Sequence, residues 1–190
     1  PESTPAASSV TEPKTDTSAV SGKKYTNDMF EYEYDANIGG MRITKYIGET
    51  LDVVIPSTLD GKPVKAVGEY AFNNGEDETA SQITSVAIPD SVTSLGDGAF
   101  RGCENLSSVV IGDGVTKIGY AAFSGCLNLS EITLGKNVSA IHDEAITGWN
   151  ELTAITVDEN NKTYCSKDGV LYNKKMTELI LCPSRKSGSF

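Results

Sequence analysis

Hydrophobic and polar positions in the middle of the chain follow one pattern that occurs twice in succession. Residues 92–111 and 115–134 are related by an offset of 23 residues, and matching residue types stand at equivalent positions: Val92 and Val115, Leu95 and Ile118, Gly96 and Gly119, Phe100 and Phe123, Cys103 and Cys126, Leu106 and Leu129, Val109 and Ile132, Ile111 and Leu134. The apolar spacing continues forward to Val157 and, with a short insertion after Phe72, backward to Val64. Self-similarity at such a period is typical of stacked supersecondary units, so the sequence predicts about four coils.

Each predicted coil ends in a short strand. In residues 108–111 and 131–134 every second residue is apolar and is expected to point inward. This is the period of a strand with one buried face. The pair Ala99-Phe100 recurs as Ala122-Phe123. It is too short for a full helix, so one turn of α- or 3₁₀-helix is expected there. A single coil cannot bury its own apolar residues, so the coils must stack on a shared core.

Alternating segments also flank the repeats. Residues 30–34, 41–46 and 51–55 predict three strands, with a hairpin turn at 37–40. We expect these strands to cover the open end of the stack, because an outermost coil would otherwise expose its apolar face and strand edge. Residues 169–172 and 179–181 predict a β-hairpin that ends at Pro183. This hairpin either caps the array or separates it from further repeats.

The expected fold is a β-rich α/β solenoid with β caps at both ends. Its parts are a disordered linker or tether over residues 1–24, an N-terminal β cap over 25–63, the repeats over 64–163, and a C-terminal β-hairpin and tail over 164–190. The first part has almost no apolar side chains and cannot offset the entropy of ordering. A flexible end without a role is the alternative to a tether. The chain lacks an initiating Met and a signal-peptide core, so we expect a processed or trimmed product.

Charge narrows the classes of partner. The 190 residues include 26 acidic and 16 basic side chains, for a net charge of −10. This charge repels nucleic acid and anionic lipid headgroups. No uninterrupted apolar run approaches the roughly 20 residues that span a bilayer. We therefore expect no nucleic-acid partner and no membrane insertion by this chain.

Several motifs recur in one register. They are Ile88-Pro89-Asp90-Ser91-Val92, the run from Leu95 to Cys103, Asn105-Leu106, the run from Val54-Ile55-Pro56 to Ala71-Phe72, and Gly169-Val170-Leu171-Tyr172 followed by residues 179–183. Over about residues 30–183 the chain thereby resembles the BspA-type leucine-rich repeats of bacterial surface proteins. The resemblance implies a right-handed leucine-rich-repeat solenoid that is extracellular or at the cell surface. The tether-like composition of residues 1–24 is consistent with a lipid or wall anchor through the region preceding residue 1. It also implies a role in adhesion or protein binding.

The last coil departs from the family pattern. His142 stands at the Gly position, Ile146 at the Phe position and Trp149 at the Cys position, so we expect this coil to turn differently. His142 is the only histidine, and its sequence neighbours provide neither an orienting partner nor a nucleophile. We interpret it as a repeat variation. The family offers no catalytic constellation, and we expect neither enzymatic activity nor a cofactor or metal.

Four cysteines, Cys103, Cys126, Cys165 and Cys182, stand outside any CxxC spacing, which argues against a zinc site. Cys103 and Cys126 occupy equivalent positions in adjacent coils, a separation that permits a disulfide. We favour two buried free thiols instead. Cys165 and Cys182 flank the terminal hairpin and form a second candidate pair.

The candidate functional site is the outward face of the repeat strands. We expect a protein-binding ladder of small, nearly uncharged residues: Ser85, Ala87, Ser108, Val110, Glu131, Thr133, Ala154 and Thr156. It lacks the Trp, Tyr and Arg that usually anchor strong interfaces. Four coils give a face of about 20 Å, short of the roughly 800 Å² per partner of a standard interface. A monomeric chain should thus bind weakly and depend on multivalency or on further repeats. The expected partner is a host extracellular-matrix protein or another cell-surface protein.

Two alternatives remain open. A structural spacer would fit the tether and the uniform ladder. A carbohydrate-binding module would need an exposed aromatic platform, for which the candidates are Tyr32, Tyr46, Tyr120 and Trp149.

Overall fold

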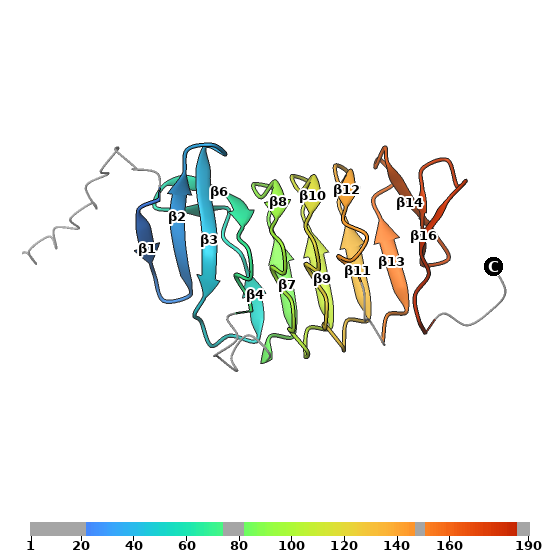
Figure 1. Ribbon diagram of the computed structural model, residues 1–190, viewed down its shortest axis with the longest axis horizontal. Helices are drawn as coiled ribbons and strands as arrows, with labels where there is room; N and C mark the ends of the chain where they lie inside the picture. The colour runs from blue at the N-terminus through green and yellow to red at the C-terminus, as the bar shows by residue number, and fades with distance from the viewer. Residues whose placement is uncertain (1–21, 74–81, 147–150, 186–190) are drawn as a thin grey trace, which may run out of the picture.

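In the residues that the structure describes, the protein is a β-solenoid of about five turns with almost no helix (Figure 1). The computed structural model describes residues 22–73, 82–146 and 151–185. One long sheet has five parallel strands: β4 (Asp52–Val54), β7 (Ser85–Ile88), β9 (Ser108–Ile111), β11 (Glu131–Leu134) and β13 (Ala154–Val157). Every pairing in it joins residues at equivalent positions of neighbouring coils.

A second sheet has eight strands and lies on the other side of the core. They are β1 (Lys24–Thr26), β2 (Phe30–Asp35), β3 (Gly40–Tyr46), β5 (Thr58–Leu59), β6 (Lys62–Val67), β8 (Ser94–Leu95), β10 (Lys117–Ile118) and β12 (Ala140–Ile141). A third sheet near the C-terminus contains β14 (Tyr164–Lys167), β15 (Val170–Asn173) and β16 (Leu179–Leu181).

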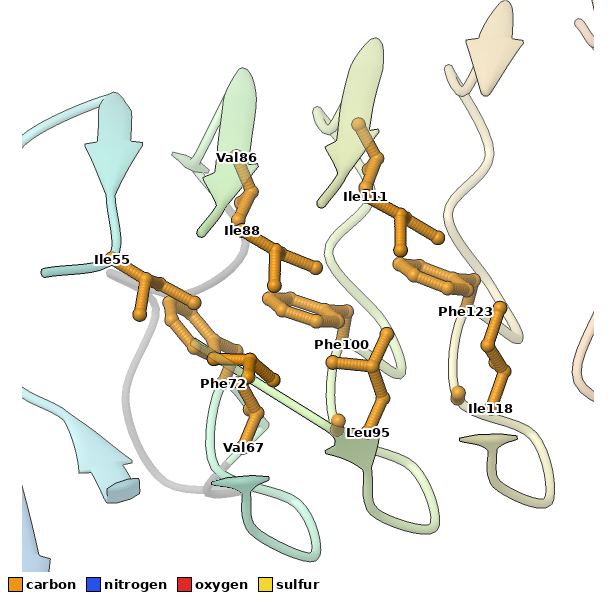
Figure 2. Packing of buried hydrophobic residues seen from close by; sticks show 14 of the residues in the cluster. Ile55, Val67, Phe72, Val86, Ile88, Leu95, Phe100, Ile111, Ile118 and Phe123 are labelled. Atoms are coloured by element: carbon orange, nitrogen blue, oxygen red, sulfur yellow. The ribbon is translucent and has the colours of Figure 1, made fainter. Parts of the chain in front are cut away.

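Aromatic rings from successive coils form a column inside the solenoid. Ring centroids lie 5.1 Å apart for Tyr46 and Phe72, 4.6 Å for Phe72 and Phe100, and 5.2 Å for Phe100 and Phe123. Aliphatic residues from both sheets pack around these rings (Figure 2). Burying each such side chain contributes about 1.5–3 kcal/mol. The stacking of coils therefore places one large apolar side chain from each of these coils at the same depth of a shared core, even where the spacing in sequence departs from 23 residues.

The expected number of four coils is too low. Residues 51–55 were assigned to the cover of the stack, but β4 pairs in parallel with β7 and is the first strand of the ladder. Val53 is buried, whereas Asp52 and Val54 face outward. The alternation in this segment is thus a strand of the repeat itself, and the ladder has five strands.

The expected helical turns are also wrong. Ala99 N–H donates to Gly96 O at 3.2 Å and Arg101 N–H to Gly98 O at 2.9 Å, so the segment forms successive tight turns. Gly98 and Gly102 have φ of 58° and 75°. These left-handed residues leave too few consecutive right-handed residues for a helix.

The flanking strands extend the solenoid in different ways. The predicted hairpin of β2 and β3 is present, and β3 continues the second sheet by pairing in parallel with β6. Its Tyr46 stacks on Phe72. At the other end β15 and β16 form the predicted hairpin, to which β14 adds a strand that the sequence did not predict. Ile155 N–H donates to Gly169 O at 2.9 Å, so this hairpin contacts the last strand of the ladder.

Candidate interaction surface

The eight predicted site residues lie in two straight rows on the five-stranded sheet, and β4 adds one further residue to each row. One row contains Asp52, Ser85, Ser108, Glu131 and Ala154, and the other contains Val54, Ala87, Val110, Thr133 and Thr156. We call these ten residues the outward ladder. The residues between the rows, such as Val109 and Ile132, point inward and are buried. Strand alternation thus brings together side chains that lie far apart in the sequence.

Asp52 and Val54 are members of the outward ladder that the sequence interpretation missed. Val54 is 69% exposed and Val110 is 55% exposed, with Ala87 between them. This part of the second row is apolar, whereas Thr133 and Thr156 at the other end of the row are polar. The signal was present in the sequence, since Ile55-Pro56 matches Ile88-Pro89 at the end of β7, but it was used only for the family resemblance and not to place the strand.

Asp52 and Glu131 are the charged residues of the outward ladder. Asp52 Oδ1 accepts hydrogen bonds from Ser85 Oγ at 2.6 Å and Thr84 Oγ1 at 2.9 Å. These two hydroxyl donors lower the pKa of Asp52. The centre of the ladder therefore presents small uncharged side chains, with carboxylates toward its first and fourth strands.

A row of hydroxyl groups fixes the start of each ladder strand. Ser107 Oγ donates to Thr84 O at 3.0 Å, Ser130 Oγ to Ser107 O at 3.1 Å, and Thr153 Oγ1 to Ser130 O at 3.0 Å. Each side chain thus binds the main chain of the preceding coil. A surface held by such bonds loses little conformational freedom when a partner docks.

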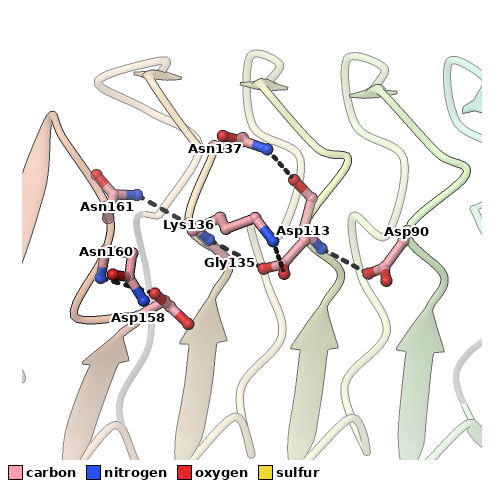
Figure 3. Close-up of polar contacts among 8 residues, drawn as sticks. All are labelled: Asp90, Asp113, Gly135, Lys136, Asn137, Asp158, Asn160 and Asn161. Atoms are coloured by element: carbon pink, nitrogen blue, oxygen red, sulfur yellow. Dashed lines mark hydrogen bonds and ion pairs between the residues drawn. The ribbon is translucent and has the colours of Figure 1, made fainter.

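Polar side chains link the coils where the ladder strands end (Figure 3). Asp113 N–H donates to Asp90 Oδ1 at 2.8 Å, and Lys136 Nζ donates to Asp113 Oδ2 at 2.6 Å. The Lys136 ammonium and main-chain N–H lower the pKa of Asp113.

Asn161 ends this series and is fully buried. Its Nδ2 donates to Gly135 O at 2.9 Å and Val138 O at 3.0 Å, and its Oδ1 accepts from the N–H groups of Thr163 and Tyr164 at 2.8 Å. The sequence shows only a break in the apolar pattern here. At this position of the repeat the other coils have a valine. Asn161 instead places a side-chain amide there, and this amide satisfies four main-chain groups.

His142 lies exposed at a turn and has contacts that do not resemble a catalytic site. Its Nδ1 accepts from Glu144 N–H at 3.2 Å, and its ring meets Tyr120 edge to face at 5.1 Å. Among the residues described by the structure, no group of three or more His, Cys, Asp or Glu side chains is arranged to hold a metal ion.

The four cysteines are free thiols, so neither candidate pair is bonded. Cys103 and Cys126 are buried, and their Sγ atoms lie 3.6 Å from Phe72 O and 3.2 Å from Phe100 O. Burial raises the pKa of Cys103 to about 12, and burial also raises the pKa of Cys126 well above its ordinary value. These thiols act as small apolar side chains, as favoured from the sequence.

The candidate aromatic residues have different environments. Tyr32 and Tyr46 are buried, and Trp149 lies outside the described residues. Tyr120 is 41% exposed. Tyr70, which the sequence interpretation did not single out, is 38% exposed.

The chain belongs to the family described as BspA type leucine rich repeat region, which matches residues 65–187 in six copies. A leucine-rich repeat protein of T. pallidum has 28% sequence identity and a TM-score of 0.63, over 74% of this chain and 63% of that protein. A leucine-rich repeat protein of Bacteroides capillosus has 29% identity and a TM-score of 0.61, over 71% of this chain and 98% of that protein. No curated protein sequence matches the chain.

The chain thus spans slightly less than two thirds of the T. pallidum protein. Within the described ranges there is no helix of the length and hydropathy needed to cross a membrane.

Proposed function

We propose that the chain is a non-enzymatic interaction module of a bacterial cell-surface protein and that it binds a protein partner through the outward ladder. The observation that carries this proposal is the exposed, nearly uncharged face of five registered strands, with Val54 and Val110 projecting from it. Interface cores are depleted in charged residues. Membership of the BspA-type repeat family supports a cell-surface location and a role in adhesion.

The size of the ladder implies weak binding by one copy. Five strands at about 4.8 Å spacing give a face of about 20 Å, whereas a standard interface buries roughly 800 Å² on each partner. Several copies on one cell would raise the effective concentration and the avidity without any new contact. We therefore expect adhesion to depend on display of many copies.

The test compares the 190-residue chain as a monomer and on beads. Both forms are presented with a panel of extracellular-matrix proteins, including fibronectin, fibrinogen, laminin and collagen. We expect saturable binding to at least one of them, stronger on beads than for the monomer. Absence of binding on beads, with cooperative unfolding of the same preparation, would contradict the proposal and favour the structural spacer.

A further inference from the structure

A second surface lies at the turns that follow the short strands of the eight-stranded sheet. Tyr70 follows β6, Tyr120 follows β10 and His142 follows β12. Arg101 and Glu144 both act electrostatically on the Tyr120 hydroxyl. We call these five residues the aromatic corner. It belongs to the sheet opposite the outward ladder.

The main chain holds the Tyr70 ring in place. Tyr70 has φ of 49°, and its N–H donates to Asp97 O at 3.0 Å in the next coil. A Cβ at Gly98 would overlap the Tyr70 ring, so this ring lies directly against the glycine. Tyr70 is 38% exposed, so part of this fixed ring is accessible to a ligand.

Tyr120 is oriented by three contacts. Its main-chain N–H donates to Asp97 Oδ1 at 2.8 Å, and its ring packs edge to face against the His142 ring, with the centroids 5.1 Å apart. Its hydroxyl donates to the Glu144 carboxylate, which raises the pKa of Tyr120, while Arg101 acts in the opposite direction. Gly98, on which the Tyr70 ring rests, donates its N–H to Tyr120 O at 2.8 Å, so the coil of Gly98 lies between the coils of the two tyrosines and connects them.

The polar groups of the corner include donors and acceptors of both charges. Arg101 offers N–H donors, Glu144 offers carboxylate acceptors, and Tyr70 offers a hydroxyl. Since His142 Nδ1 accepts a hydrogen bond, the neutral ring carries its proton on Nε2 and donates from there. An anionic ligand would meet Glu144, and a cationic ligand would meet Arg101. An uncharged ligand with many hydroxyl groups matches this mixture, and its C–H surface matches the tyrosine rings.

We propose that the aromatic corner is a binding site for a neutral carbohydrate. The pyranose face packs on Tyr70 and Tyr120, and its hydroxyl groups bond to Arg101, Glu144 and His142. This site is separate from the protein-binding ladder. A surface protein with both would contact a glycan and a protein on different faces.

In the test, the 190-residue chain is titrated with neutral hexaoses of β-glucan, α-glucan, mannan and chitin, and binding is measured by calorimetry. Heparin and poly-lysine serve as charged comparisons. The variants are Tyr120→Ala and Tyr70→Asn, because Asn tolerates the left-handed conformation of residue 70. Leu127→Ala is the matched control, since Leu127 is 40% exposed and lies outside the corner. Thr133→Lys tests the ladder independently.

We expect at least one neutral hexaose to bind, and each tyrosine variant to raise its Kd about tenfold. Leu127→Ala and Thr133→Lys should leave this Kd unchanged. Three results would overturn the proposal: no binding by any hexaose, equal binding by Tyr120→Ala, or Tyr120-dependent binding of poly-lysine or heparin alone. Matrix-protein binding that survives Tyr120→Ala but not Thr133→Lys would leave the ladder proposal intact in each case.

Discussion

Phe100 and Phe123 stack almost parallel, with ring centroids 5.2 Å apart and an interplanar angle of 4°, although 23 residues separate them in the sequence. Both rings are fully buried. The contact therefore joins two coils and not residues that are neighbours in sequence. Each coil is thus stabilised by the coils on either side, as in other repeat proteins.

Phe123→Ala should lower the free energy of unfolding by about 3–5 kcal/mol, because it removes a buried ring and leaves a cavity between coils. Urea denaturation followed by circular dichroism measures this change. Val110→Ala is the matched control, and we expect it to change stability by less than about 0.5 kcal/mol, because Val110 is exposed. Equal loss in both variants would show that the aromatic column does not hold the coils together.

The repeat and its core could be predicted from the sequence because buried positions recur at one fixed spacing. The turn conformation could not be predicted from that spacing. It depends on the left-handed φ of residues such as Gly98, and Ala121 adopts a φ of 48° at the equivalent position without being glycine. Assignment of residues 51–55 to the cover failed for a related reason. A strand of the ladder and a strand of a cap have the same alternation, and only pairing with β7 distinguishes them.

Asn161→Ala should reduce stability by about 2–6 kcal/mol, since four main-chain groups lose their partner and each hydrogen bond contributes about 0.5–1.5 kcal/mol. Thermal unfolding of the variant measures the loss. The neighbouring exposed Asn160→Ala serves as control. A variant of Asn161 as stable as that control would mean that the buried amide does not anchor the end of the repeat.

Asp113→Asn should make stability less dependent on pH. The folded pKa of Asp113 lies below its ordinary value of 3.8, and that of Lys136 lies above its ordinary value of 10.5. The pair therefore contributes stability between these values, and the contribution is lost as pH falls through the folded pKa of Asp113. The difference in urea midpoint between parent and variant should be largest near neutrality and disappear in acid.

The control for this change is Asp28→Asn, which removes the same charge at an exposed position. A difference between the parent and Asp113→Asn that persists unchanged at low pH would contradict the proposed role of the ion pair. Added salt should reduce the effect, because the Lys136 side chain is 46% exposed.

Cys103 and Cys126 should resist alkylation in the folded protein. Their raised pKa values keep the thiols protonated, and the thiolate is the reactive form. Iodoacetamide treatment at about pH 8, followed by peptide mass spectrometry, should modify these residues only in denaturant. The half-buried Cys165 and Cys182 are internal comparisons. Rapid modification of Cys126 without denaturant would show that the coils open in solution.

The site was predictable from the sequence only in part. Alternation was sufficient to assign outward positions such as Ser108 and Thr133, because a strand with one buried face fixes the direction of every side chain. The aromatic corner was predictable only in part. Tyr120 was a candidate from the sequence, but Tyr70 and Tyr120 occupy different positions of their repeats, and it is Gly98 of the coil between them that connects the Tyr70 ring to the Tyr120 main chain.

The most direct test of the account compares two lysine substitutions on opposite sheets. Thr133 is exposed on β11 in the outward ladder, and Ala140 is exposed on β12 of the other sheet. Bead-bound Thr133→Lys and Ala140→Lys are titrated with the matrix protein that the parent chain binds most strongly. We predict that Thr133→Lys abolishes saturable binding while Ala140→Lys retains it. Equal binding by the two variants, or no saturable binding by the parent chain, would contradict the outward ladder as a protein-binding face.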